Sequence, residues 1–97
     1  MNIITIDPCF TKGDEDLFSG EAELGNIKIT QPAIEELKKQ FDSVQVTPGN
    51  EMIILTNPPV EKIIIFDTGR VIIRRIASKD LAISRFGLIE NLLTQML

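Results

Sequence analysis

The chain has 97 residues, a formal net charge of −4 at pH 7, and 43% hydrophobic and 25% charged residues. This length fits one small domain with a single core, and this composition is typical of a globular chain in water. The negative charge argues against indiscriminate binding to phosphates, and the single cysteine excludes an internal disulfide.

Targeting signals are not evident in the sequence. The N-terminus lacks the basic region and the long apolar run of a signal peptide. No apolar stretch has the length of a membrane span. We therefore predict a cytoplasmic protein that has no membrane partner.

The first quarter of the chain is acidic. Residues 1–24 contain one lysine and six acidic residues, whereas residues 25–97 are nearly neutral. Residues 2–6 are consistent with a short strand that Asp7-Pro8 closes, and residues 11–20, rich in Gly, Ser and acid, are typical of a loop. We treat residues 1–23 as an acidic N-terminal segment, which is either a solvated linker or a cover that folds over a surface of the same molecule.

Residues 24–97 have the pattern of one domain. Leu24–Thr30 alternates apolar and polar residues, which predicts a strand with one buried face. Pro32 suits the first turn of a short amphipathic helix that ends near Phe41. Strands are then expected at 44–46, 51–56, 62–66 and 70–76, followed by a long helix from the N-cap Ser78 to Leu97.

The last two strands form a β-hairpin in this interpretation. They flank Asp67-Thr68-Gly69, where glycine adopts a positive φ at low cost. Both faces of these strands are apolar, whereas an exposed antiparallel sheet normally keeps one polar face. We therefore predict an α+β fold: one antiparallel sheet with both helices on one face and a partner on the other.

The hairpin and its flanks also follow a known family pattern. The matching positions hold Pro59-Val60, Ile65-Phe66, Thr68-Gly69-Arg70, Val71-Ile72-Ile73 and Ala77-Ser78 with Asp80, and upstream Gly25-Asn26-Ile27 and Pro48-Gly49. These residues resemble one repeat of the TATA-box-binding protein, and the resemblance covers residues 24–97. It implies a half-saddle, in which a curved antiparallel sheet carries a short and a long helix on one face.

The resemblance further implies a DNA-facing side on the sheet face away from the helices. Phe66 matches one of the two phenylalanines that each family repeat inserts between base pairs in the minor groove. Thr47 or Asn50 stands at the position of the second phenylalanine, and Leu55 replaces a phosphate-binding arginine. Carried over by position, the face includes Ile53, and the predicted nucleic-acid-binding residues are Asn26, Lys28, Leu55, Ile64, Phe66, Ile72 and Arg74.

Two functions remain open at this point. The first is a DNA-binding, transcription-associated module, in which two copies join along the Leu24–Thr30 edge as a homodimer and rebuild the two-repeat saddle. The second is a protein-interaction module whose apolar sheet face is covered by a partner or by the acidic N-terminal segment. In the first, the residues expected to reach phosphates are Lys28, Arg70, Arg74, Arg75 and Lys79.

An enzyme is not predicted. The chain has no His, Tyr or Trp, and Cys9 has no base beside it to activate a thiolate. Neither a glycine-rich phosphate loop nor a metal-ligand spacing occurs in the sequence. We therefore predict no catalytic residues, no cofactor and no metal.

Overall fold

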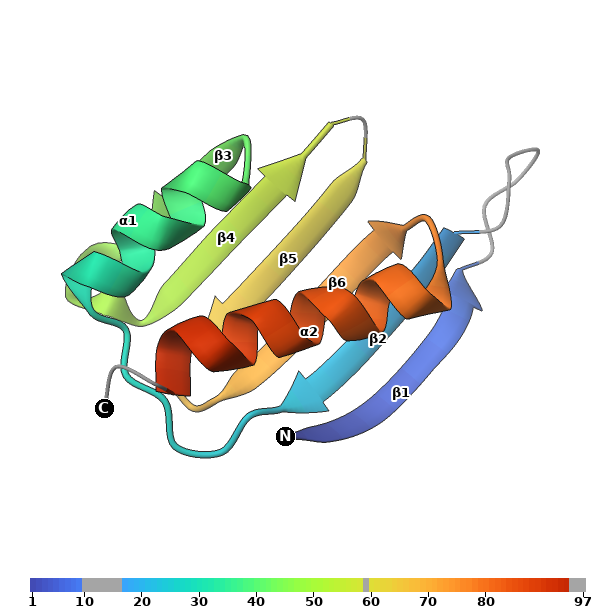
Figure 1. Ribbon diagram of the computed structural model, residues 1–97, viewed down its shortest axis with the longest axis horizontal. Helices are drawn as coiled ribbons and strands as arrows, with labels where there is room; N and C mark the ends of the chain where they lie inside the picture. The colour runs from blue at the N-terminus through green and yellow to red at the C-terminus, as the bar shows by residue number, and fades with distance from the viewer. Residues whose placement is uncertain (10–16, 59, 95–97) are drawn as a thin grey trace.

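The computed structural model describes residues 1–9, 17–58 and 60–94. Six strands form one antiparallel sheet in the order β1-β2-β6-β5-β4-β3. Both helices lie on the same face of this sheet (Figure 1). The predicted α+β class, with one short and one long helix, is confirmed. The elements in chain order are β1 (Asn2–Cys9), β2 (Leu17–Glu23), α1 (Gln31–Gln40), β3 (Ser43–Val46), a 3-10 turn (Pro48–Asn50), β4 (Met52–Asn57), β5 (Glu61–Phe66), β6 (Arg70–Ile76) and α2 (Lys79–Thr94).

The core fills the space between the sheet and the helices. Across the three central strands, directly opposed residues point into it, such as Leu55, Ile63 and Ile73, which have no exposed surface. From the helix side, Leu37 and Phe86 are equally buried. Burial of each such side chain contributes about 1.5–3 kcal/mol relative to an exposed one. The helix layer therefore covers this face of the sheet.

Local signals place the two helices as expected. The hydroxyl of Thr30 accepts a hydrogen bond from the Ala33 amide (3.3 Å), and Pro32 occupies the first turn of α1. The hydroxyl of Ser78 accepts one from the Leu81 amide (3.0 Å), so Ser78 caps α2 as predicted. Each hydroxyl pairs with one of the backbone N–H groups that a helix start leaves without a partner.

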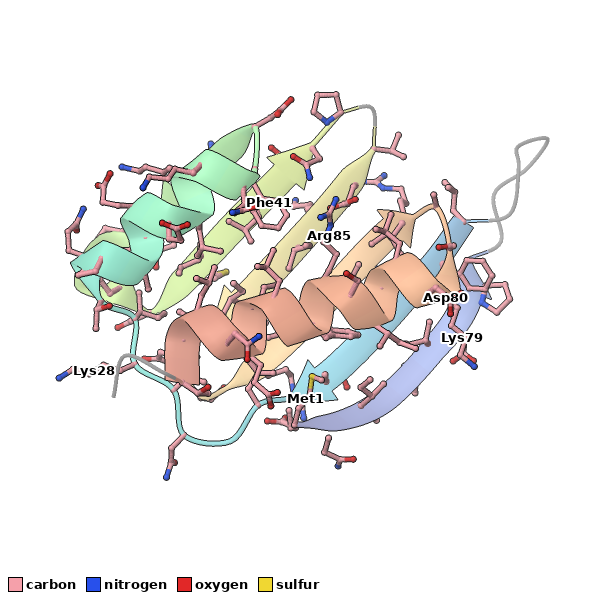
Figure 2. The ribbon with its side chains drawn as sticks, in the orientation of Figure 1. Met1, Lys28, Phe41, Lys79, Asp80 and Arg85 are labelled. Carbon is pink, nitrogen blue, oxygen red and sulfur yellow. The ribbon has the colours of Figure 1, made fainter. Side chains whose placement is uncertain are left out.

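One basic side chain of α2 connects the helix layer to the start of β5. Arg85 of α2 donates a hydrogen bond from Nε to Glu61 Oε2 (3.1 Å) at the start of β5. Its guanidinium also lies 5.3 Å from the centre of the Phe41 ring, just after α1 (Figure 2). The Arg85 side chain therefore stabilises the packing of the helices on the sheet.

The N-terminal segment differs from its predicted role. Residues 17–20, expected in a loop, belong to β2, which lies between β1 and β6; the other residues of that expected loop, 11–16, lie outside the described ones. Gly20 suggested a loop, but an added Cβ there would come 3.2 Å from the Phe86 ring. Gly20 therefore allows the strand to approach the helix closely. The described part of the N-terminal segment extends the sheet by two strands.

The strand expected at Leu24–Thr30 is absent, and that prediction is wrong. Gly25 has a φ of 84°, and the chain from Leu24 to Thr30 runs as an irregular connection from β2 to α1. The strand at this place in the sheet is β2, which pairs with β1 on one side and β6 on the other. A dimer axis along this strand is therefore blocked, and in the described sheet the outer edges are those of β1 and β3. The homodimer itself stays a prediction.

Candidate functional site

The sheet face away from the helices, here called the open face, carries an apolar patch. Ile54, Ile64 and Ile72 lie directly opposite one another across β4, β5 and β6, and each is half-buried. Met52 and Phe66 oppose each other two residues further along. The patch thus consists of Met52, Ile54, Ile64, Phe66 and Ile72. Three of the predicted binding residues, Ile64, Phe66 and Ile72, belong to it.

The predicted position of β4 side chains was reversed. Leu55 and Ile53 face the helices and have no exposed surface, so neither reaches a ligand. Leu55 opposes the buried Ile63, while its neighbour Ile54 opposes Ile64 on the open face. The strand is apolar at four successive positions, and its alternation therefore fits either orientation. Pairing with β5 decides between them.

Asn26 and Lys28 do not lie on the sheet. Both are exposed in the irregular connection between β2 and α1. The backbone amide of Lys28 donates to the Leu93 carbonyl at 3.4 Å, near the end of α2, and its side chain points away from the molecule (Figure 2). The structure does not bring these two residues together with the apolar patch.

A β-bulge in β6 turns two consecutive arginines away from the core. Arg75 has a φ of 58°, and the pairing of β2 with β6 shifts register beside it, between Phe18 and Gly20. As a result Arg74 and Arg75 are both exposed, and Ile76 returns to the core with no exposed surface. A bulge of this kind re-aims side chains. Regular alternation would have placed Arg75 in the core.

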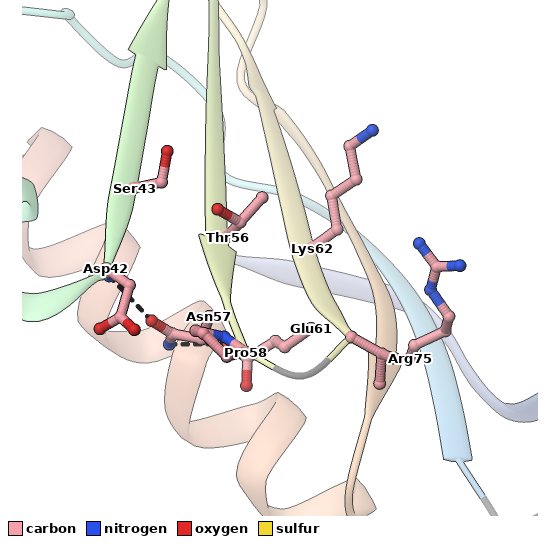
Figure 3. Close-up of a pocket in the computed structure, with 9 residues that line it drawn as sticks. Asp42, Ser43, Thr56, Asn57, Pro58, Glu61, Lys62 and Arg75 are labelled. Atoms are coloured by element: carbon pink, nitrogen blue, oxygen red, sulfur yellow. Dashed lines mark hydrogen bonds between the residues drawn. The ribbon is translucent and has the colours of Figure 1, made fainter.

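Lys62 completes a basic cluster with these arginines. It lies directly opposite Arg74 in the pairing of β5 with β6. Lys62 and Arg75 line one depression and project on the same side of the sheet as Ser43 and Thr56 (Figure 3). Within the described residues, none of Lys62, Arg74 and Arg75 forms a salt bridge. Like charges on facing strands repel each other, and a bound anion would relieve that repulsion.

Arg70, at the other end of β6, is ion-paired, in contrast to Arg74 and Arg75. Its Nε donates to Glu23 Oε1 at 2.8 Å, and its guanidinium lies 3.9 Å from Glu21 Oε1. The hydrogen bond to Glu23 and the charges of Glu21 and Glu23 raise the pKa of Arg70 above its usual value. Arg70 thus stays charged, and the carboxylates of Glu21 and Glu23 offset its charge, whereas the cations at the opposite end of the strand form no salt bridge within the described residues.

Two of the depressions that adjoin the basic cluster show which charges surround it. The one that Lys62 and Arg75 line has a volume of about 370 Å³, and it includes Ser43, Thr56, Asn57 and Asp42 (Figure 3). Asn57 is occupied there: its side chain accepts from the Asp42 amide (3.0 Å) and donates to Glu61 (3.3 Å).

The second depression, about 270 Å³, is lined by Arg74 and Ile72 and by the acidic residues Asp7 and Glu21. The β1–β2 side of the open face is thus acidic. The depression on the β4–β3 side combines the hydroxyl groups of Ser43 and Thr56 with Asp42 and with Glu61, which is already bound to Arg85 and Asn57.

Sequence reasoning missed Lys62 and the origin of the cluster. Alternation along β5 places Lys62 on the same side as Ile64 and Phe66, so this signal was present. The bulge at Arg75 could not be predicted from the sequence. Glycine usually marks a left-handed position, and an arginine there is uncommon.

In residues 1–9, 17–58 and 60–94, no group of three or more His, Cys, Asp or Glu side chains is placed to hold a metal ion. None of the described helices has the length and apolarity that crossing a membrane requires.

Comparisons with protein families, with curated proteins and with solved structures find no match for the chain.

Proposed function

We propose that the chain is a non-enzymatic nucleic-acid-binding module that acts through the open face of its sheet. The observation that carries this proposal is the position of the basic cluster directly beside the apolar patch, on the face that the helices leave uncovered. Basic side chains supply most of the affinity for a phosphate backbone, and apolar side chains accept the faces of bases.

The resemblance to a repeat of the TATA-box-binding protein supports the same proposal. It motivates DNA as the nucleic acid and a transcription-associated role. Phe66, the residue that matches a wedging phenylalanine, lies half-buried in the apolar patch. Two details weaken the match. Leu55, at the position of a phosphate-binding arginine in the family, is buried, and residues 24–30 form no strand.

Charge limits the strength of this binding. The cluster offers three cations, and the net charge of the whole chain is −4. Neutralising three phosphates predicts that the logarithm of the binding constant falls against the logarithm of salt concentration with a slope of roughly −2 to −3. We expect binding that is measurable at low salt and weak at moderate salt.

The proposal is tested by fluorescence anisotropy with the full-length protein. The labelled probes are a single-stranded oligonucleotide, an AT-rich duplex and a GC-rich duplex, each at low and moderate salt. Lys62→Glu should weaken binding about tenfold or more, because it places a negative charge beside the phosphates. Lys28→Glu makes the same charge change off the sheet and should leave binding within about twofold. If no probe binds, or if both variants lose equally, the proposal fails.

The protein-interaction alternative is favoured by the acidic side of the open face. Asp7 and Glu21 border the apolar patch next to β1 and β2, which suits a partner with both basic and apolar groups. Deleting residues 1–22 does not separate the two functions, because β2 pairs with β6 and removing it damages the sheet. Point substitutions on the open face are the appropriate probes.

A further inference from the structure

We infer that the open face takes single-stranded rather than double-stranded nucleic acid, with one sugar–phosphate backbone along the basic cluster and the bases over the apolar patch. This inference rests on the proposed function and specifies its ligand. It follows from how charge and apolar surface are distributed on the two sides of the Ile54, Ile64 and Ile72 row.

The open face has two parallel rows that cross the strands. One row is polar and consists of Ser43, Thr56, Lys62 and Arg74, which oppose one another from β3 to β6. The other row, Ile54, Ile64 and Ile72, lies two residues along each strand, or about 6.7 Å away. A backbone on the first row therefore has its bases within reach of the second.

The length of the polar row sets a site size. Four adjacent strands span about 14 Å from the first to the last, since neighbouring strands lie about 4.8 Å apart. Consecutive phosphates of one backbone lie about 6–7 Å apart, because the backbone runs obliquely to its 3.4 Å rise per nucleotide, so the row accommodates about three phosphates. The row begins at Arg74 with the second guanidinium of Arg75 and runs toward β3, away from Asp7 and Glu21.

The other side of the isoleucine row offers no equivalent anchor. It carries Met52 and Phe66, and Arg70 there is already bound to Glu23 and lies near Glu21. A duplex presents two backbones, one on each side of its bases, and the second backbone would meet these carboxylates. The backbone of a single strand follows only the basic side, and its bases reach across the isoleucine row, where they can stack on Phe66 and the aliphatic side chains.

Arg75 gives the site its asymmetry. Its left-handed backbone is a conformation that side chains other than glycine rarely adopt, and here it doubles the positive charge on β6 at one end of the polar row. Arg75→Gly keeps this backbone conformation at low cost and removes the guanidinium. The substitution therefore separates the contribution of the charge from that of the bulge.

The experiment compares labelled oligo-dT with the same strand annealed to oligo-dA, using full-length protein and anisotropy at low salt. We expect the single strand to bind at least tenfold more tightly than the duplex. Arg75→Gly should weaken single-strand binding about fivefold or more. Arg70→Gln, the matched control on the same strand, removes one positive charge as well but should leave single-strand binding within about twofold, because Arg70 is paired with Glu23 and Glu21 and contacts no phosphate. Circular dichroism verifies that both variants are folded.

The outcomes separate the inference from the proposed function. Equal or tighter binding of the duplex overturns the inference while nucleic-acid binding stands. An effect of Arg70→Gln that matches or exceeds that of Arg75→Gly also overturns it, because the backbone then follows the wrong side of the isoleucine row. Absence of binding to either probe defeats the proposed function itself.

Discussion

At the scale of single residues, positions with positive φ fix the turns and the close backbone contacts of this fold. Gly69, with a φ of 100°, closes the turn between β5 and β6, as the sequence predicted. Its carbonyl accepts a hydrogen bond from the Leu24 amide (2.8 Å), and a Cβ at Gly69 would collide with the Gly25 carbonyl oxygen. Gly69 therefore fastens the end of β2 to the hairpin, a contact that the turn motif alone does not predict.

Gly69→Ala should lower the free energy of unfolding by about 2–4 kcal/mol, because it adds a backbone collision to an unfavourable φ. Gly25→Ala is the matched control: its φ is 84°, and among the described residues no heavy atom beyond its two chain neighbours lies within 4 Å of the added Cβ. The control should cost only about 1 kcal/mol. Urea unfolding measures both values, and equal losses would show that the collision is relieved without cost.

At the scale of elements, the sequence predicted which strands exist better than how they face. All four strands between the helices and both helices lie near their expected residues, because turn residues and helix caps are local signals. The orientation of β4 was not accessible, since Met52, Ile53, Ile54 and Leu55 are all apolar. The location of β2 was missed because its Gly20 and acidic residues are typical of loops.

Leu55→Ala and Ile54→Ala test the orientation of β4 directly. Leu55→Ala should cost about 2–5 kcal/mol of unfolding free energy, because it leaves a cavity between sheet and helices. Ile54→Ala removes half-exposed atoms from the open face and should cost about 1 kcal/mol. Chemical denaturation of the two variants gives the comparison. A larger loss for Ile54→Ala would mean that β4 is turned the other way.

At the scale of the whole molecule, function depends on one face being covered and the other left open. The sequence predicted this division from two apolar faces and two helices, and the structure places the helices on one side only (Figure 1). The predicted binding residues separate accordingly: Ile64, Phe66, Ile72 and Arg74 lie on the open face, Leu55 is buried, and Asn26 and Lys28 lie off the sheet. Long-range pairing decides this outcome, and no local pattern contains it.

The most direct test of the open face as the binding surface is a methyl NMR titration of the full-length protein with oligo-dT. We predict that signals of Ile54, Ile64 and Ile72 shift with the ligand, whereas those of Ile83 and Leu88 on α2 stay in place. Saturating shifts confined to the helix side, or no shifts at all at low salt, would contradict the account.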